Sequence, residues 1–280
     1  MSSSSPPTGR PDVEEPTVQY RCGLITGASS GIGAEFARQL AHSCRVLVLV
    51  ARRSEALEEL ATELRQSNPD LTVRCLPADL TDDGQRQALV GRMHQASLVP
   101  DLVINNAGMG DYGEFASSEW PKVEAMLRLN VEALTALTHA LLPGMISTGG
   151  GAILNVSSLA SLLPIPDFAV YAATKAYVTS FSEALRLELK DYGLSVTALC
   201  PGPVHTGFGD VARRGENRPD EPFREWFYVD APQVVAEALQ GLALNRPRVF
   251  PGWKIAGAAV LLGLLPIAIL RIAMGSRPRR

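Results

Sequence analysis

The chain of 280 residues is poor in cysteine, and its four cysteines fit neither a disulfide framework nor a metal site. Both kinds of site need closely and regularly spaced cysteines. Here they are widely separated and lie in apolar or strand-like runs: Cys22, Cys44, Cys75 and Cys200. We interpret all four as small buried hydrophobic residues and expect no metal.

An apolar core is missing from the first twenty residues, which are rich in serine, proline and acidic side chains. They therefore do not form a secretory signal, and we expect residues 1–20 to be a flexible tail. Hydrophobic residues make up 46% of the chain and charged residues only 20%, which is typical of a globular protein. We expect a cytoplasmic protein without a nucleic-acid partner.

Strand-like runs alternate with helical patterns along the chain and no internal repeat is present. Strands are predicted at Cys22–Thr26, Arg45–Val50, Thr72–Leu76, Leu102–Asn105, Ala152–Val156, Leu194–Leu199 and Val249–Phe250. Helices are predicted at Ala34–Leu40, Ser54–Ser67, Asp83–Gln95, Trp120–Leu142, Tyr171–Lys190 and Pro232–Leu242. Such alternation predicts an α/β fold, a doubly wound seven-stranded parallel sheet with helices on both faces.

Glycines are concentrated at one strand-to-helix junction, Thr26-Gly-Ala-Ser-Ser-Gly-Ile-Gly33. Glycine permits positive φ and close approach of a ligand to the backbone. The N-terminus of the following helix offers free N–H groups to a pyrophosphate. The spacing G-x-x-x-G-x-G thus indicates a dinucleotide site, and the alternative is a glycine-rich turn without a ligand.

Two arginines follow the second strand, where an acidic residue would bind the adenosine ribose of NAD. Arg52 and Arg53 stand at this point, and no acidic residue occurs before Glu55. Guanidinium groups match phosphate geometry, so we predict recognition of a 2′-phosphate and a preference for NADP(H) over NAD. The alternative is a pair of solvated arginines at a helix start.

A tyrosine and a lysine occur four residues apart, at Tyr171 and Lys175. Residues at this spacing share one face of a helix. A cation held close to a phenol favours the phenolate, so we expect Lys175 to lower the pKa of Tyr171 and to suit it to proton transfer at neutral pH. The strand Ile153–Val156 ends in Ser157 and Ser158, whose hydroxyls face the ligand crevice of an open sheet.

These motifs make the sequence resemble the short-chain dehydrogenase/reductase superfamily, in its single-domain Rossmann-fold subgroup, over roughly Arg21 to Gly252. The family serine lies thirteen residues before the tyrosine, which selects Ser158. Further matches are Asp79-Leu80, the N-N-A-G segment Asn105–Gly108, Asn130 and the P-G segment Pro201–Thr206. Some NADP-preferring members carry a basic residue in the glycine loop, where this chain has Ser30.

The resemblance implies an enzyme that interconverts a ketone or aldehyde and an alcohol. It implies that Tyr171 is the acid, that Ser158 binds the carbonyl oxygen, that Lys175 holds the nicotinamide ribose and lowers the tyrosine pKa, and that Asn130 holds a water. The cofactor-binding residues it implies are Gly27, Ser29, Ser30, Gly31, Ile32, Gly33, Arg52, Arg53, Asp79, Leu80, Asn106, Ala107, Gly108, Tyr171, Lys175, Pro201, Gly202, Val204 and Thr206.

Residues 203–230 lack periodicity and read as a long substrate loop. Its aromatic residues either line a substrate pocket or pack the loop down: Phe208, Phe223, Trp226, Phe227 and Tyr228. Together with the apolar C-terminus they favour a hydrophobic substrate that is lipid-, acyl- or steroid-like. The resemblance also implies a homodimer or homotetramer.

Residues 253–280 form a hydrophobic, basic extension. Ile255 to Leu270 is a run of sixteen residues without charge, interrupted by Pro266. No acidic residue occurs from Ala238 onward, whereas this part has seven basic residues. Three interpretations stay open: a lid or packing helix over the active site, an element that associates peripherally with a membrane surface, or a membrane span.

Two other functions are compatible with a dinucleotide fold. One is a catalytically silent regulator or scaffold, which would typically lack the tyrosine or the lysine. The other is an epimerase or dehydratase of nucleotide sugars, which usually has a larger C-terminal domain than the roughly 90 residues after the Tyr171–Lys190 helix allow.

Overall fold

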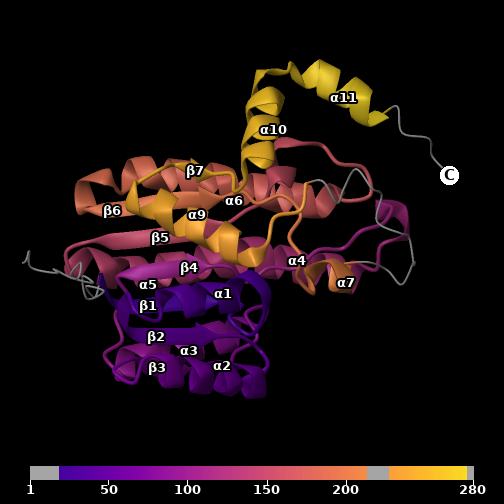
Figure 1. Cartoon of the computed structure of the whole chain (residues 1–280). Helices are drawn as coiled ribbons and strands as arrows, with labels where there is room; N and C mark the ends of the chain where they lie inside the picture. The colour runs from indigo at the N-terminus through magenta and orange to yellow at the C-terminus, as the bar shows by residue number, and fades with distance from the viewer. Residues whose placement is uncertain (1–18, 213–226, 276–280) are drawn as a thin grey trace, which may run out of the picture.

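A computed structural model describes residues 19–212 and 227–275 of the chain. Its centre is one parallel sheet of seven strands in the order β3-β2-β1-β4-β5-β6-β7 (Figure 1). The strands are β1 (Tyr20–Thr26), β2 (Cys44–Val50), β3 (Thr72–Cys75), β4 (Leu102–Asn105), β5 (Gly151–Val156), β6 (Leu194–Leu199) and β7 (Arg248–Val249). The order reverses between β1 and β4, which is where open α/β sheets bind ligands beyond the carboxyl ends of their strands.

Helices cover both faces of the sheet because the strand side chains alternate between two hydrophobic cores. Ile25 belongs to the core under α1 (Gly31–Leu40), α2 (Ser54–Ser67) and α9 (Ala231–Ala243). Its neighbour Leu24 belongs to the opposite core, under α3 (Asp83–Gln95), α5 (Leu134–Ser147) and α6 (Ala169–Glu188). Both side chains are fully buried. The α/β fold class predicted from the sequence is therefore confirmed.

Most predicted boundaries agree with the structure to within one or two residues, and α2 and α3 agree at both ends. The prediction of a single helix over Trp120–Leu142 was wrong. This stretch comprises α4 (Trp120–Leu127), the π-helical turn η2 (Arg128–Ala133) and most of α5. α5 also continues past Pro143, where a helix usually ends. The buried side chain of Met145 holds this last turn against the sheet.

Short helices complete the body of the molecule. Three are 3₁₀ turns: η1 (Phe115–Ser117), η3 (Leu159–Leu162) and η4 (Lys190–Tyr192). A fourth, α7 (Phe208–Ala212), lies inside the predicted loop 203–230. Residues 213–226, with Phe223 and Trp226, lie outside the described residues, as does nearly all of the predicted N-terminal tail. The division into residues 1–20, 21–252 and 253–280 stays a prediction.

The C-terminal extension forms two helices, α10 (Trp253–Leu264) and α11 (Ile267–Gly275), with the break at Leu265–Pro266. α10 projects from the body, and α11 runs to the side from its outer end (Figure 1). Among the helices of the described residues, none is both long and apolar enough to cross a membrane.

Candidate active site

The glycine loop between β1 and α1 has a backbone that only glycine allows. Gly27 and Gly31 have φ of +66° and +56°. A Cβ on Gly33 would lie 2.2 Å from the carbonyl oxygen of Gly27 and 2.5 Å from Nδ2 of Asn106. The first turn of α1 therefore presses directly on the end of β1, and its free N–H groups open onto the crevice beside β4. This cradle suits a pyrophosphate.

The loop is joined to β4 by a set of short hydrogen bonds around Thr26. The backbone N–H groups of Asn106 and Ala107 both donate to Oγ1 of Thr26 at 3.0 Å. Nδ2 of Asn106 donates to the carbonyl oxygens of Thr26 and Gly27. Gly108 follows directly in the chain. A Cβ on Gly108 would lie only 3.3 Å from Nζ of Lys175, so a side chain there would crowd the lysine.

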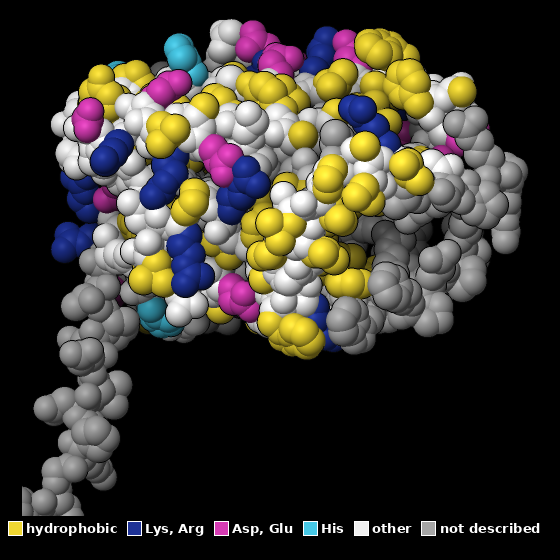
Figure 2. All heavy atoms as spheres, turned by 90° about the horizontal axis from the view of Figure 1, so that it is seen from above, with side chains coloured by type: hydrophobic (Ala, Val, Ile, Leu, Met, Phe, Trp, Pro, Cys, Tyr) yellow, Lys and Arg dark blue, Asp and Glu magenta, His cyan; other side chains and the backbone are white. Residues whose placement is uncertain are grey.

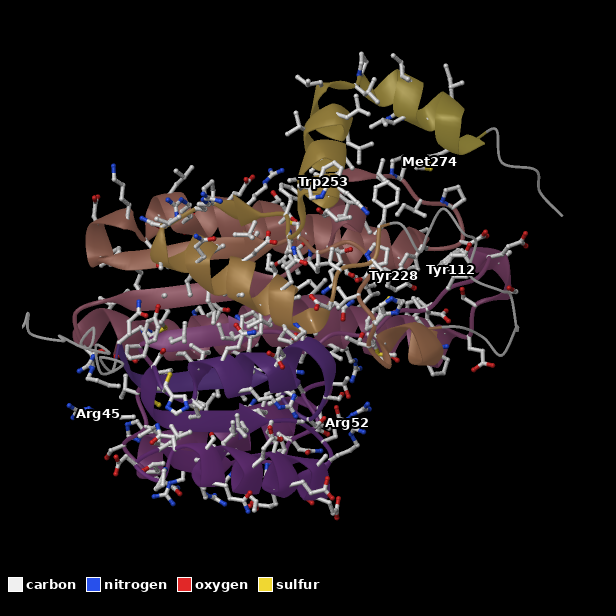
Figure 3. All side chains as sticks on the ribbon, in the orientation of Figure 1. Arg45, Arg52, Tyr112, Tyr228, Trp253 and Met274 are labelled. Atoms are coloured by element: carbon white, nitrogen blue, oxygen red, sulfur yellow. The ribbon has the colours of Figure 1, made fainter. Side chains whose placement is uncertain are left out.

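The two arginines after β2 differ in their contacts. Nη2 of Arg53 donates to Oγ of Ser29 at 3.1 Å and to Oγ of Ser30 at 2.9 Å. A guanidinium thus reaches the glycine-loop position where the sequence has Ser30 instead of a basic residue. Arg52 is exposed at the carboxyl end of β2, on the side of Tyr112 and Tyr228 and far from Arg45 at the other end of the strand (Figure 3).

Asp79 lies close enough to Arg52 for the two charges to interact. Its carboxylate accepts hydrogen bonds from the backbone N–H and the hydroxyl of Thr81, at 2.9 and 2.8 Å. Burial acts to raise the pKa of Asp79, but these hydrogen bonds and the charge of Arg52 together lower it. The carboxylate is therefore ionised, and the neighbouring Leu80 is buried in the core behind it.

Lys175 is buried, and its position is set by the end of β5. Its Nζ donates to the carbonyl oxygen of Val156 at 2.8 Å. The backbone carbonyl of Lys175 in turn accepts from Oγ of Ser157 at 2.8 Å, and that hydroxyl also bonds Thr179. Ser157, the serine not selected for catalysis, thus holds α6 against β5.

Ser158 and Tyr171 meet in front of this lysine. Oγ of Ser158 accepts from the backbone N–H of Ala160 at the start of η3, and it also forms a hydrogen bond with Tyr171. Nζ of Lys175 lies 5.7 Å from the centre of the Tyr171 ring. The three side chains that the sequence predicted to act together are therefore brought together.

The pKa of Tyr171 departs from the sequence-based expectation. Burial raises it to about 12, against a smaller lowering by the hydrogen bond with Ser158. Burial likewise lowers the pKa of Lys175 to about 8, with Cys200 acting in the opposite direction. The expected lowering of the tyrosine pKa by Lys175 is not seen in this structure, where burial of the phenol outweighs the hydrogen bond with Ser158.

Asn130 lies in the π-helical turn η2 and is buried beside the same group. Its Oδ1 accepts from the backbone N–H of Met109 at 2.9 Å, and its Nδ2 donates to the carbonyl of Met109 and to Oγ1 of Thr174. π-Helical turns are often found at functional sites, because the extra residue redirects a side chain. A Cβ on Gly108 would lie 3.4 Å from Oδ1 of Asn130, which places the amide next to Lys175.

The P-G segment closes the site from the β6 side. The carbonyl of Pro201 accepts from the backbone N–H of Leu159, and Val204 forms an isolated parallel bridge with Val229. Thr206 lies over the glycine loop, so a Cβ on Gly31 would be 3.2 Å from its methyl carbon. A Cβ on Gly202 would meet Cδ1 of Ile255 at 2.4 Å. The base of α10 is therefore part of the wall behind the P-G segment.

Aromatic rings surround Tyr171. Phe168 stacks on its ring with the centroids 4.2 Å apart, and Tyr112 meets Phe168 edge-on. Phe208 was expected either to line a substrate pocket or to pack the loop down, and its ring centroid lies 5.6 Å from that of Tyr171. Sequence reasoning missed Phe168 and Tyr112, and the only available signal was the position of Phe168 three residues before the tyrosine, one helical turn away.

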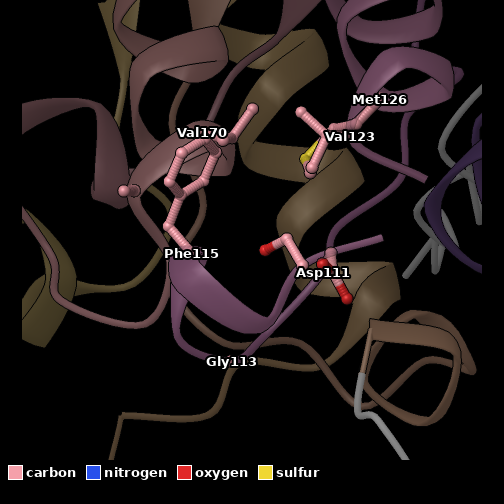
Figure 4. A pocket seen from close by; sticks show the side chains of 8 residues that line it. Asp111, Gly113, Phe115, Val123, Met126 and Val170 are labelled. Carbon is pink, nitrogen blue, oxygen red and sulfur yellow. The ribbon is translucent and has the colours of Figure 1, made fainter. Parts of the chain in front are cut away.

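Two hollows lie near these rings. A small pocket of about 10 Å³, enough for one water, is lined by Asp111, Gly113, Phe115, Ser118, Val123, Met126, Ala169 and Val170 (Figure 4). Asp111 is buried there and pairs with Lys122 at 2.9 Å. A larger open groove of about 580 Å³ runs along η3 and the start of α6. Across the described ranges, no cluster of His, Cys, Asp and Glu side chains could hold a metal ion.

Comparisons with known proteins identify the family of this chain. The short chain dehydrogenase family model matches residues 21–217. Sulfoacetaldehyde reductase 2 of Chromohalobacter salexigens is 35% identical over 76% of this chain and 83% of its own length. A very-long-chain 3-oxoacyl-CoA reductase-like protein of Arabidopsis thaliana is 32% identical over 91% of this chain and 81% of its own.

The solved structures include a short-chain dehydrogenase from Sphingobium yanoikuyae in complex with NADPH. It has a TM-score of 0.76 and 31% identity, and the match covers 92% of this chain and 97% of that one. The chain belongs to the short-chain dehydrogenase/reductase superfamily. It is an oxidoreductase of the class that interconverts carbonyl and alcohol groups.

Replacing Gly33 by alanine tests the cradle. The added Cβ would overlap the Gly27 carbonyl, so we expect Gly33→Ala to displace the loop and to weaken NADPH binding by about a hundredfold or more, equivalent to roughly 2.7 kcal/mol. Binding would be measured by isothermal titration calorimetry. Gly91→Ala is the matched control, because no atom lies within 4 Å of the Cβ position at Gly91 on α3. Unchanged affinity in Gly33→Ala would show that the loop does not hold the cofactor.

The raised pKa of Tyr171 predicts at which pH the phenol loses its proton when the protein is titrated without cofactor. A phenol whose pKa is about 12 keeps its proton as the pH rises through 10 and loses it only near the higher value. We expect the ultraviolet difference titration between the wild type and Tyr171→Phe to show no phenolate step below about pH 11. Circular dichroism would verify that both proteins stay folded. A step at neutral or slightly alkaline pH would mean that the Lys175 cation prevails over burial.

Proposed function

We propose that this protein is an NADP(H)-dependent reductase of hydrophobic ketones or aldehydes. The observation that carries the proposal is the group formed by the half-buried Ser158 and the buried Tyr171 and Lys175, beside a glycine cradle to which Arg53 is hydrogen-bonded. The cofactor is NADP(H), and the physiological direction is reduction.

The chain's own residues perform the proton transfer and the positioning. Tyr171 donates its proton to the carbonyl oxygen, and Ser158 donates a hydrogen bond to the same oxygen as negative charge develops on it. The high pKa of Tyr171 keeps the phenol protonated throughout the neutral range, which suits an acid that works in the reductive direction. When bound, the nicotinamide ring supplies the hydride.

Lys175 and Asn130 support this acid from behind. The ammonium of Lys175 holds the nicotinamide ribose hydroxyls. Asn130, anchored by Met109 and Thr174, holds a water that links Lys175 to solvent and resupplies the proton. Both side chains are buried, so their hydrogen bonds are strengthened by the low local dielectric.

Cofactor preference is supported by the two arginines and by the absence of an acidic residue between β2 and Glu55. Arg53 and the Ser29–Ser30 hydroxyls form one side of a phosphate site, and Arg52 forms the other. The Sphingobium relative was solved with NADPH. Asp79 and the Leu80 backbone would contact the adenine, and Ile32, Ala107, Gly108, Val204 and Thr206 would contact the remaining cofactor.

A hydrophobic substrate is supported by the rings of Tyr112, Phe168 and Phe208 around the catalytic phenol. The Arabidopsis relative is named for very long acyl chains, whereas the Chromohalobacter relative is named for sulfoacetaldehyde, which is small and anionic. Aromatic walls favour the first kind of substrate. A silent dinucleotide-binding regulator is disfavoured, because the tyrosine, serine and lysine are all present and lie together, with Ser158 hydrogen-bonded to Tyr171 and Nζ of Lys175 5.7 Å from the centre of the tyrosine ring.

Self-association follows the family pattern, through α5 and α6. Tyr177 and Leu187 lie exposed on α6, and the Tyr177 ring stacks on Phe181. Apolar side chains on a helix face of this kind are suited to a homodimer or homotetramer interface.

Turnover of a ketone panel with NADPH tests the function. We expect reduction of long-chain and steroid-like ketones in preference to sulfoacetaldehyde. Tyr171→Phe should lower kcat by ~10²–10⁴-fold while NADPH affinity stays within a factor of about two, because the phenol acts on the substrate and most cofactor contacts lie elsewhere. Wild-type turnover in this variant would remove Tyr171 from the mechanism. No NADPH oxidation with any carbonyl, together with tight NADPH binding, would favour the silent regulator.

Charge reversal at Arg52 tests the cofactor preference. We expect Arg52→Asp to weaken NADPH binding by about ten- to a hundredfold and to strengthen NADH binding, because a carboxylate repels the 2′-phosphate and accepts from a free ribose hydroxyl. Arg45→Asp reverses an exposed charge at the opposite end of the same strand and should leave both affinities unchanged. Equal effects of the two substitutions would point to the overall field of the protein instead of a contact.

A further inference from the structure

The two C-terminal helices carry an exposed hydrophobic surface, which we call the α10–α11 surface. The side chains of Trp253, Leu264 and Ile272 are 76%, 78% and 72% exposed. The other large exposed apolar residues of the surface are Val260, Leu261 and Ile269. Hydrophobic side chains gather on the face seen from above, toward which α10 projects (Figure 2). Exposed apolar patches of this kind on a folded protein mark interaction sites.

The surface is held to the body at the base of α10, and Leu270 on α11 is also buried, whereas the outer apolar side chains of α10 are exposed. Ile255 is fully buried against Gly202, and Ala259, one turn further, is also buried. Beyond that point α10 exposes Val260, Leu261 and Leu264. Its orientation is therefore determined by the P-G segment, while its outer two turns remain available.

The apolar area extends from the helices onto the body. α10 packs on η3, and the open groove of about 580 Å³ begins at η3. None of the residues that line this groove is charged: Ser161, Leu162, Leu163, Pro164, Ile165, Pro166, Ala169, Ala172, Ala173 and Ala176. The groove and the α10–α11 surface thus form one low-polarity region at the same side of the molecule.

Charge distinguishes among the partners that such a region could take. The segment from Ala238 to the C-terminus has seven basic residues and no acidic one, whereas the preceding part has 19 basic and 29 acidic residues. Lys254 and Arg271 belong to α10 and α11, and three more arginines follow at 277, 279 and 280. A second copy docked through the same face would bring like charges together, because a twofold interface pairs each patch with itself.

We propose that the α10–α11 surface docks on an anionic lipid bilayer, with its apolar side chains in the interfacial layer and its basic side chains at the head groups. Short helices with exposed apolar side chains enter about 5–10 Å into this layer without crossing it. Each basic residue near an anionic surface adds attraction that salt screens. In the docked protein, the apolar groove along η3 and the start of α6 is turned toward the lipid.

Cosedimentation of the full-length protein with vesicles tests the proposal. We expect binding to vesicles of phosphatidylcholine and phosphatidylglycerol, weaker binding to phosphatidylcholine alone, and loss of binding as salt is raised. The double substitution Leu261→Glu/Leu264→Glu should weaken binding by about tenfold or more, because two leucine side chains would no longer be transferred from water into the bilayer. Trp253 fluorescence should shift to the blue on binding, and Trp253→Phe should abolish that shift.

Leu244→Glu is the matched control, because Leu244 has nearly the same exposure as Leu261, 58% against 60%, but lies at the end of α9. It should bind vesicles like the wild type. Tyr171→Phe should also bind like the wild type, so that the docking and the proposed reductase activity are tested separately.

Three results would overturn the proposal. The first is vesicle binding that is absent, or equally affected by Leu244→Glu. The second is a lipid-free dimer that Leu261→Glu/Leu264→Glu dissociates, which would make the surface a contact between copies. The third is a loss of turnover of a small water-soluble ketone in the double variant without vesicles, which would make the helices a lid.

Discussion

The burial of Lys175 is the constraint on which the rest of the site depends. An ammonium group in so little water must have a strong acceptor, and the carbonyl oxygen at the end of β5 supplies it. That contact is possible only because Ser157 and Thr179 hold α6 at the right height along the strand. With α6 placed in this way, Tyr171 lies in front of Ser158, and the amide of Asn130 approaches from η2. The site is thus assembled by packing one helix on one strand end.

The parts of the fold that depend on local pattern could be predicted from the sequence. β4, β6, α2 and α3 have the predicted boundaries. The glycine loop could be predicted because the positions that need positive φ or close backbone packing are occupied by glycine in the sequence. The Tyr171–Lys175 spacing likewise determines that both side chains share a face of α6.

Other features depend on distant contacts and left no local signal. The π-helical turn at Asn130 has the same composition as an ordinary helix, so its residue types do not distinguish it from the flanking α-helices. Tyr112 meets Phe168 beside Tyr171 only after folding. The pKa of Tyr171 was misjudged because the spacing to Lys175 is visible in the sequence, whereas the loss of water around the phenol is not. The contact of Ile255 with Gly202 joins residues more than fifty positions apart in the chain.

The order of the strands also bears on how the chain reaches this structure. β1 pairs on one side with β2, its successor, but on the other side with β4, and Asp101 bonds the backbone of Cys22 across 79 residues. Joining β1 to β4 therefore requires closure of a long loop, whereas β1, β2 and β3 can assemble through shorter connections. Contacts so distant in sequence slow folding, and until they form the apolar edge of β1 is open to other chains. The central pairing that creates the ligand crevice is thus also the step at which a newly made chain is most exposed to aggregation.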